Sequence, residues 1–286
     1  MTHSLFLPFP RALPCSIALV LALLPLLPRS AAAQSPETVE FARGGILVGT
    51  FTAEDLAARV PAAPIPVFEA HEERMRVYRA MPARAVLDAV FGSDWRRAQE
   101  IVFTCRDGYQ PSIPVARFVA RDAYLALASG DDIIPFTLVN ALQNDETVAL
   151  GPLYLVWGIN PDEPPGVTAS AMPYQIRRIA LRPMASSSAT APPPASPAAA
   201  WRGHAHFRRH CMACHAIHGE GGGKAPPLAS PAYPEEPLEP AYLRRWIENP
   251  QAVRPGTTMP ALARDLPERE AIVEDLVAYL RAVNGR

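Results

Sequence analysis

Residues 210–218 read HCMACHAIH, and this stretch decides how the C-terminal part of the chain is interpreted. Two residues separate its two cysteines, and a histidine directly follows the second cysteine. This spacing is compatible with a redox-active dithiol, with a zinc site and with covalent attachment of haem. The flanking segments have to distinguish these three chemistries.

A thioredoxin-like dithiol needs a β-α-β setting with the cysteines at the start of a helix, and no such order surrounds Cys211 and Cys214. A zinc site would need further cysteine or histidine ligands at a distance, but none follows His218. The haem-attachment pattern C-x-x-C-H is complete: both thiols add to the haem vinyl groups, and His215 binds the iron. We therefore interpret the stretch as a haem-binding site with one covalent haem c.

The second axial ligand of the iron is sought among the methionines of the same region, Met212 and Met259. Met212 lies between the two cysteines and cannot reach the opposite face of the haem. Met259 lies in RPGTTMPAL, a loop shaped by proline and glycine, whereas the nearby histidines are too close to His215 in sequence. We expect Met259 as the ligand, and a thioether ligand raises the reduction potential.

Helical patterns surround this site. WRGHAHFRRH is predicted to be helical up to the cysteines, a second helix is predicted over 239–249, and a third is predicted to begin at the cap Asp265 and to end at Gly285. Such a small three-helix domain has little core of its own, so a buried cofactor would stabilise it. The other histidines, His204, His206, His210 and His218, are expected at the surface.

Segment 201–286 resembles a class I cytochrome c domain over nearly its whole length. Gly203, Phe207 and Cys211 stand at intervals of four, as in the N-terminal helix of that family, where the glycine permits close crossing of the C-terminal helix. Tyr279 matches the aromatic residue of that second helix. The resemblance implies an all-α fold and single-electron transfer.

Two further residues gain roles from this resemblance. GGGKAPPL resembles the loop in which a proline carbonyl accepts the Nδ1–H of the proximal histidine, and Pro226 fits that place. YLRRWIENPQAVRPGTTMP resembles the stretch that runs to the distal methionine, and Trp246 holds the position that commonly meets a haem propionate.

The rest of the chain divides by composition. Residues 1–33 combine Arg11, an apolar run and small residues near Ala33, which predicts a cleaved secretory signal peptide. Residues 185–200 contain only Ala, Ser, Thr and Pro, which predicts a spacer between a domain over 34–184 and the domain over 201–286. The spacer should let the two domains move independently.

Location and partners follow from the same composition. No other segment has the ~18 apolar residues that a membrane span needs, so we expect an exported, soluble, periplasmic protein without an integral span after cleavage. A formal net charge of −1 argues against nucleic-acid binding.

The N-terminal domain is predicted to be α+β. Helices are expected over 52–60, capped by Thr52, and over 82–92, ended by Gly92. Strands are expected over 100–105, 151–157 and 174–181.

Two motifs of this domain, VFTCRDGYQPSIPVARF (102–118) and LGPLYLVWG (150–158), resemble the oxidoreductase molybdopterin-binding (sulfite oxidase-type) fold over roughly residues 75–182. Members with the metal carry a molybdenum-binding cysteine well upstream of the DGY turn, but residues 35–104 contain no cysteine. Cys105 does not match that position and is expected to be a small buried residue. Molybdopterin is therefore not expected.

Together these features predict an exported monohaem electron carrier whose N-terminal domain docks a partner or substrate, and the partner of the haem is expected to be a periplasmic redox protein. Two alternatives stay open. One is a sulfite dehydrogenase-like molybdoenzyme with a fused haem c domain, and the other is a haem-based sensor or assembly factor.

Overall fold

The computed structural model describes residues 37–141, 145–159, 169–182, 189–229 and 239–285. The predicted signal peptide and residues 185–188 of the predicted spacer lie outside these ranges. Residues Pro36–Arg286 form one compact unit, which contains two hydrophobic cores. We call the parts around these cores the N-terminal and C-terminal domains.

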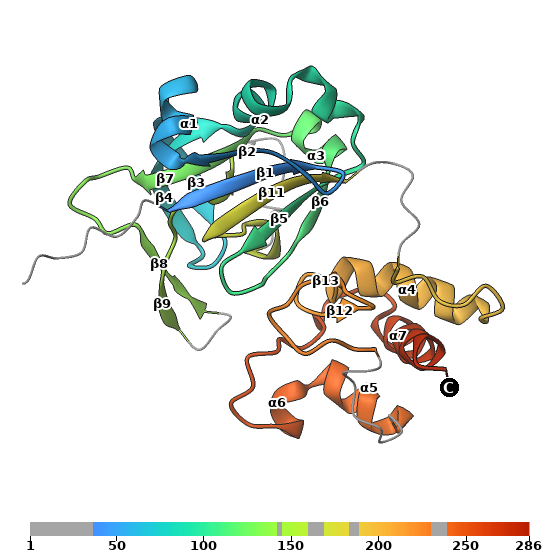
Figure 1. Ribbon diagram of the computed structural model, residues 1–286. Coiled ribbons are helices and arrows are strands. Elements are labelled where there is room, and N and C mark those ends of the chain that lie inside the picture. The colour runs from blue at the N-terminus through green and yellow to red at the C-terminus, as the bar shows by residue number, and fades with distance from the viewer. Residues whose placement is uncertain (1–36, 142–144, 160–168, 183–188, 230–238, 286) are drawn as a thin grey trace, which may run out of the picture. The chain divides into compact units, whose positions relative to one another are not determined.

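The N-terminal domain is built on two β-sheets (Figure 1). The first has the order β2-β1-β11-β5-β6, in which only β1 and β11 are parallel. The second has the order β10-β7-β4-β3 and is antiparallel throughout. The strands are β1 (Thr38–Arg43), β2 (Ile46–Thr52), β3 (Ala63–Glu69), β4 (Arg74–Pro82), β5 (Glu100–Cys105), β6 (Ser112–Pro114), β7 (Ala123–Ser129), β10 (Tyr154–Trp157) and β11 (Ile176–Arg182), with a separate hairpin of β8 (Thr137–Asn140) and β9 (Glu146–Ala149).

Short helices connect these strands: α1 (Ala53–Arg59), α2 (Ala83–Phe91), α3 (Val115–Ala120) and the 3-10 helix η1 (Ser93–Arg97). The predicted cap Thr52 is confirmed at α1, and it forms a capping box with Asp55: the Asp55 N–H donates to Thr52 Oγ1 (3.0 Å) and the Thr52 N–H donates to the Asp55 carboxylate (2.9 Å). The C-cap of α2 is Gly92, as predicted. The α+β character of this domain is confirmed.

The predicted strands are confirmed with changed ends. Strand β5 has the predicted bounds, whereas β10 begins at Tyr154 instead of Gly151, since Pro152 has no N–H to donate to a ladder. Strand β11 begins at Ile176, after Gln175 in the left-handed conformation (φ 53°). Strand β3, APIPVFE, was not predicted because it contains two prolines, which a sheet tolerates at an edge strand such as this one.

A buried carboxylate lies at the end of β3. Glu69 is fully buried, and its carboxylate accepts hydrogen bonds from the hydroxyls of Tyr78 (2.7 Å) and Tyr154 (2.9 Å) and lies 2.9 Å from Nδ1 of His71. Burial acts to raise the pKa of Glu69, but the hydrogen bonds from His71 and Tyr78 outweigh it and hold the pKa below its ordinary value of 4.5. The carboxylate is therefore charged and fully bonded inside the domain.

We predict that Glu69→Gln lowers the free energy of unfolding by about 2 kcal/mol at pH 7, because it removes the charge that these donors face. A carboxylate with a depressed folded pKa stabilises the fold above its unfolded pKa and loses this effect as the pH falls through the folded pKa. The stability of the wild-type protein should therefore fall below about pH 4.5, and the variant should lose stability less steeply there. Denaturant titrations from pH 3 to 7, read in the far ultraviolet, measure both effects. If the free energy of unfolding fell equally with pH in the wild type and in Glu69→Gln, this account of Glu69 would be contradicted.

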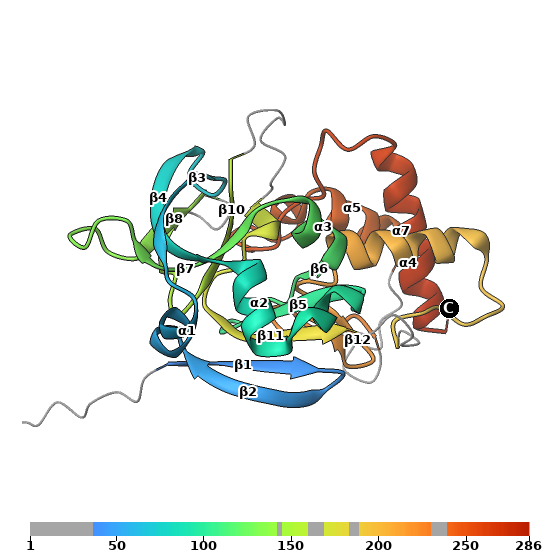
Figure 2. The same ribbon diagram turned by 90° about the horizontal axis from the view of Figure 1, so that it is seen from above.

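The C-terminal domain contains α4 (Ala198–His210), α5 (Pro240–Glu248), α6 (Pro250–Val253), α7 (Arg269–Val283) and a small pairing of β12 (Ala216–Ile217) with β13 (Glu220–Gly221). Helix α4 crosses α7 (Figure 2) at Gly203, where an added Cβ would lie 1.9 Å from the carbonyl oxygen of Asp275. The predicted start of the third helix is wrong: α7 begins at Arg269, because Glu268 adopts the left-handed conformation and Asp265 lies outside the helix.

The described part of the predicted spacer, residues 189–200, contacts the C-terminal domain at Thr190. Thr190 is fully buried, its hydroxyl lies 2.8 Å from Nε2 of His204, and its carbonyl accepts from the hydroxyl of Tyr279 (2.6 Å). Helix α4 also begins inside the predicted spacer, at Ala198. The spacer composition of Ala, Ser, Thr and Pro therefore concealed a segment that belongs to the folded domain.

Candidate functional site

The two cysteines of the attachment stretch lie in a tight turn that continues α4. The N–H of Cys211 donates to the Phe207 carbonyl (2.9 Å), and the N–H groups of Cys214 and His215 both donate back to the Cys211 carbonyl (3.1 and 3.0 Å). Because Phe207 is fully buried against Tyr279, this turn is anchored in the core of the C-terminal domain. The helix pair thus positions both thiols and His215.

The two thiols are free, and their surroundings keep them protonated. Burial, followed by the neighbouring Cys214, raises the pKa of Cys211 to about 12, and burial also raises the pKa of Cys214. A redox-active dithiol needs the opposite shift, because its nucleophile is the thiolate. The site therefore does not have the electrostatics of a thioredoxin-like centre.

His215 is held in the state that a metal ligand requires. Its Nδ1 lies 2.7 Å from the carbonyl oxygen of Pro226, so this nitrogen carries the proton and Nε2 is left with a free lone pair. Burial lowers the pKa of His215, and the bond to Pro226 only partly opposes it. A neutral imidazole oriented by a backbone carbonyl is the form that binds iron.

Glycines bring the segment after β13 onto the cysteine turn. An added Cβ on Gly222 would lie 2.0 Å from the Ala213 carbonyl oxygen, and the Gly222 N–H donates to the Met212 carbonyl (2.8 Å). The Ala225 N–H donates to the Cys214 carbonyl (3.0 Å), which brings the following Pro226 to His215. A larger residue at Gly222 would push this segment off the cysteine turn and move Pro226 away from the imidazole of His215.

Met259 and Trp246 lie on a different segment, formed by α5, α6 and the loop that follows them. Trp246 is half-buried on α5, and its ring stacks on Tyr242 with the centroids 6.2 Å apart. Met259 is partly buried, and its N–H donates to Thr257 Oγ1 (3.3 Å). The side chain of Gln251 bonds to Thr257 O and accepts from the Gly256 N–H (3.1 Å), so this loop has a defined conformation.

The remaining histidines differ in part from the prediction. His204 is half-buried, with its ring centroid 5.5 Å from that of Tyr279, so its expected position at the surface was wrong. His206 and His210 lie one turn apart with ring centroids separated by 6.4 Å, and His218 is exposed. Within the described ranges, no group of three His, Cys, Asp or Glu side chains could hold a metal ion.

Cys105 is 2% exposed at the end of β5, as expected for a small buried residue. Burial raises the pKa of its thiol well above the ordinary value of 9.0. This environment does not favour the thiolate that a metal would need.

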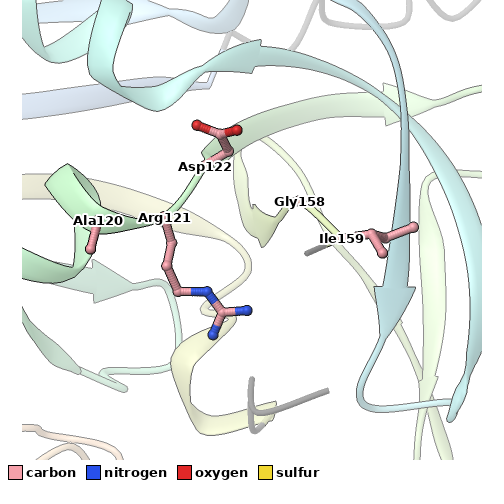
Figure 3. Close-up of a pocket in the computed structure, with 5 residues that line it drawn as sticks. All are labelled: Ala120, Arg121, Asp122, Gly158 and Ile159. Atoms are coloured by element: carbon pink, nitrogen blue, oxygen red, sulfur yellow. The ribbon is translucent and has the colours of Figure 1, made fainter. Parts of the chain in front are cut away.

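A cavity of about 260 Å³ lies elsewhere in the N-terminal domain, between the end of α3 and the end of β10 (Figure 3). The guanidinium of Arg121 extends into it, and Ala120, Asp122, Gly158 and Ile159 complete the described lining. No sequence pattern pointed to this cavity. The five described lining residues all belong to the N-terminal domain, and none of them is part of the cysteine turn.

Comparison with known families defines the class of the C-terminal domain. Residues 200–284 match the family model described as Cytochrome c, so this part of the chain is a cytochrome c domain. That family implies covalently bound haem c, a role in haem-based electron transfer and redox partners. The oriented His215 and the two adjacent thiols fit such a haem.

The matched residues do not extend into the N-terminal domain. A search of curated proteins finds no match to the chain. In the part of the chain that the structure describes, no helix is long and apolar enough to cross a membrane.

Proposed function

We propose that this protein is an exported monohaem c-type cytochrome that transfers single electrons, and that its N-terminal domain docks a partner or substrate. The observation that carries the proposal is the bond between Nδ1 of His215 and the Pro226 carbonyl, next to two protonated thiols in one turn. This arrangement supports one axial ligand and two covalent attachment points on a single short segment.

Each residue of the site has a defined task. Cys211 and Cys214 would hold the haem through thioethers, and His215 would bind the iron through Nε2 while Pro226 fixes its ring. Met259 would supply a thioether as a second iron ligand, and Trp246 would donate its indole N–H to a propionate. When bound, the haem supplies the one-electron change between ferric and ferrous iron, and the thioether ligand favours the ferrous state.

The N-terminal domain is proposed to have the sulfite oxidase-type fold without its metal. The buried, protonated Cys105 supports this view, since molybdenum in that fold is bound by a thiolate. A domain of this kind retains a surface on which a partner or substrate binds, while the haem carries the electron. We place the protein in the periplasm, where a second redox protein exchanges electrons with it.

Retention of haem through denaturation tests the proposal. After expression with the c-type maturation machinery, the wild-type chain should keep its haem peroxidase stain on a denaturing gel. The Cys211→Ser/Cys214→Ser variant should lose all of it, because no thioether then joins haem to the chain. Cys105→Ser is the matched control and should stain like the wild type. Equal staining of the double variant and the wild type would refute covalent attachment at these cysteines.

A further inference from the structure

The turn between β5 and β6 lies directly on the cysteine turn. The N–H of Gln110 donates to the Ala213 carbonyl (2.7 Å), and the N–H of Gly223 donates to the Gly108 carbonyl (2.9 Å). These two backbone bonds join Gly108 and Gln110 of the N-terminal domain to Ala213, which precedes Cys214, and to Gly223, which precedes Lys224. Both bonds lie within the compact unit Pro36–Arg286.

The contact leaves no room for a side chain at Gly108. An added Cβ would lie 2.7 Å from the carbonyl carbon of Gly223 and 2.9 Å from the N of Lys224. Gly108 also has φ +84°, a conformation that side chains disfavour. The two backbones therefore touch without an intervening layer of side chains or water.

An ion pair closes the same contact. Nζ of Lys224 lies 2.7 Å from the Asp107 carboxylate and 5.7 Å from the ring centroid of Tyr109. Burial acts to lower the pKa of Lys224, but the hydrogen bond and charge of Asp107 outweigh it, so the pKa is raised and the amine stays charged. Lys224 is the single lysine of the sequence, in which arginine supplies all the other basic side chains apart from histidine.

A second polar contact supports the first. Glu100 on β5 accepts from Arg208 on α4 (3.0 Å), and Arg182 on β11 lies 3.3 Å from both Glu100 and Glu220. Strands of the N-terminal domain are thus joined to α4 and to β13. Two separate contacts fix an orientation, whereas one alone would allow rotation.

We propose that residues 107–110, together with Lys224, form an intramolecular docking clasp that holds the cysteine turn against the N-terminal domain in one orientation. The Gln110–Ala213 bond and the position of Lys224 Nζ, 5.7 Å from the ring centroid of Tyr109, place this tyrosine beside the cysteine turn. The clasp therefore shields the Ala213–Cys214 side of the turn.

One consequence rests on the proposed function. A redox protein cannot dock on the shielded side while the clasp is closed, so electrons are exchanged with external partners over another part of the haem domain. A partner or substrate that binds the N-terminal domain near Tyr109 would therefore lie next to the Ala213–Cys214 side of the cysteine turn. The clasp itself depends only on contacts within the chain.

The single lysine gives a direct test with the full-length holoprotein. A water-soluble carbodiimide activates the Asp107 carboxyl, and the Lys224 amine then displaces the urea to form an amide across the clasp. Peptide mass mapping should find this amide in the wild-type protein, with a yield independent of protein concentration. Lys224→Arg keeps the charge but cannot form the amide, and it verifies the assignment.

Gly108→Ala should lower the amide yield about tenfold, because its Cβ forces the two backbones apart and depopulates the closed state. Gly45→Ala is the matched control, since Gly45 has nearly the same φ (+86°) but nothing within 4 Å of an added Cβ. It should give the wild-type yield.

Three results would overturn the clasp: no Asp107–Lys224 amide in the wild type, an unchanged yield in Gly108→Ala, or an equal loss in Gly45→Ala. None of them depends on haem chemistry, so a failed clasp and a failed haem assignment are distinguishable.

Discussion

Replacing Met259 with alanine should abolish the weak near-infrared sulfur-to-iron absorption of the oxidised protein. It should also lower the reduction potential by about 0.2 V, a fraction of the ~0.8 V over which axial ligands set haem potentials. The reason is that the thioether stabilises ferrous iron, and a vacant or water-filled position does not. Absorption spectra and a potentiometric titration measure the two effects.

Met212→Leu is the matched control for this experiment. Met212 is buried within the cysteine turn, between the two cysteines, and leucine conserves its volume and apolar character. The near-infrared band should survive in this variant. If the band persists in Met259→Ala and vanishes in Met212→Leu, the assignment of the distal ligand is wrong.

Gly203→Ala should destabilise the C-terminal domain by about 2 kcal/mol or more. Alanine gains about 1 kcal/mol over glycine in a helix interior, but the added Cβ meets the Asp275 carbonyl oxygen at 1.9 Å and Cβ of Tyr279 at 2.6 Å. The Asp275 backbone cannot move aside without separating α4 from α7. Overpacking of this kind typically lowers the free energy of unfolding by about 1–3 kcal/mol, and any loss of haem would add to that cost. Denaturant unfolding followed in the haem absorption measures the change.

The control lies on the same helix. Ala205 is exposed on α4, and Ala205→Gly should cost only the helix-propensity difference of about 1 kcal/mol. Comparison of the two variants separates packing from propensity. A Gly203→Ala variant that is as stable as the wild type would show that the close helix crossing does not hold the domain together.

The sequence was informative where local patterns determine structure. Thr52 predicted the capped start of α1, Gly92 predicted the end of α2, and the strand pattern over 100–105 predicted β5. The spacing of Cys211, Cys214 and His215 predicted a single local site, and the resemblance of GGGKAPPL to a cytochrome c loop implied Pro226 as the partner of the imidazole. These features depend on residues that are close in sequence.

Other features depend on contacts between distant residues and were missed. Nothing in FEAHEERM reveals that Glu69 and His71 meet Tyr154 inside a sheet, because Tyr154 follows many residues later. Thr190 was placed in a spacer, since its buried partner Tyr279 is near the other end of the domain. The same reason explains why the sequence around the DGY turn did not reveal that Asp107 pairs with Lys224.

One measurement tests the central claim, that the C-terminal domain carries one covalent haem c, most directly. It is the intact mass of the purified wild-type chain under denaturing conditions, combined with the peroxidase stain of the same sample on a gel. The account predicts a mass equal to the processed chain plus one haem, and a stained band at the position of the polypeptide. A mass equal to the chain alone, with the colour released on denaturation, would contradict it.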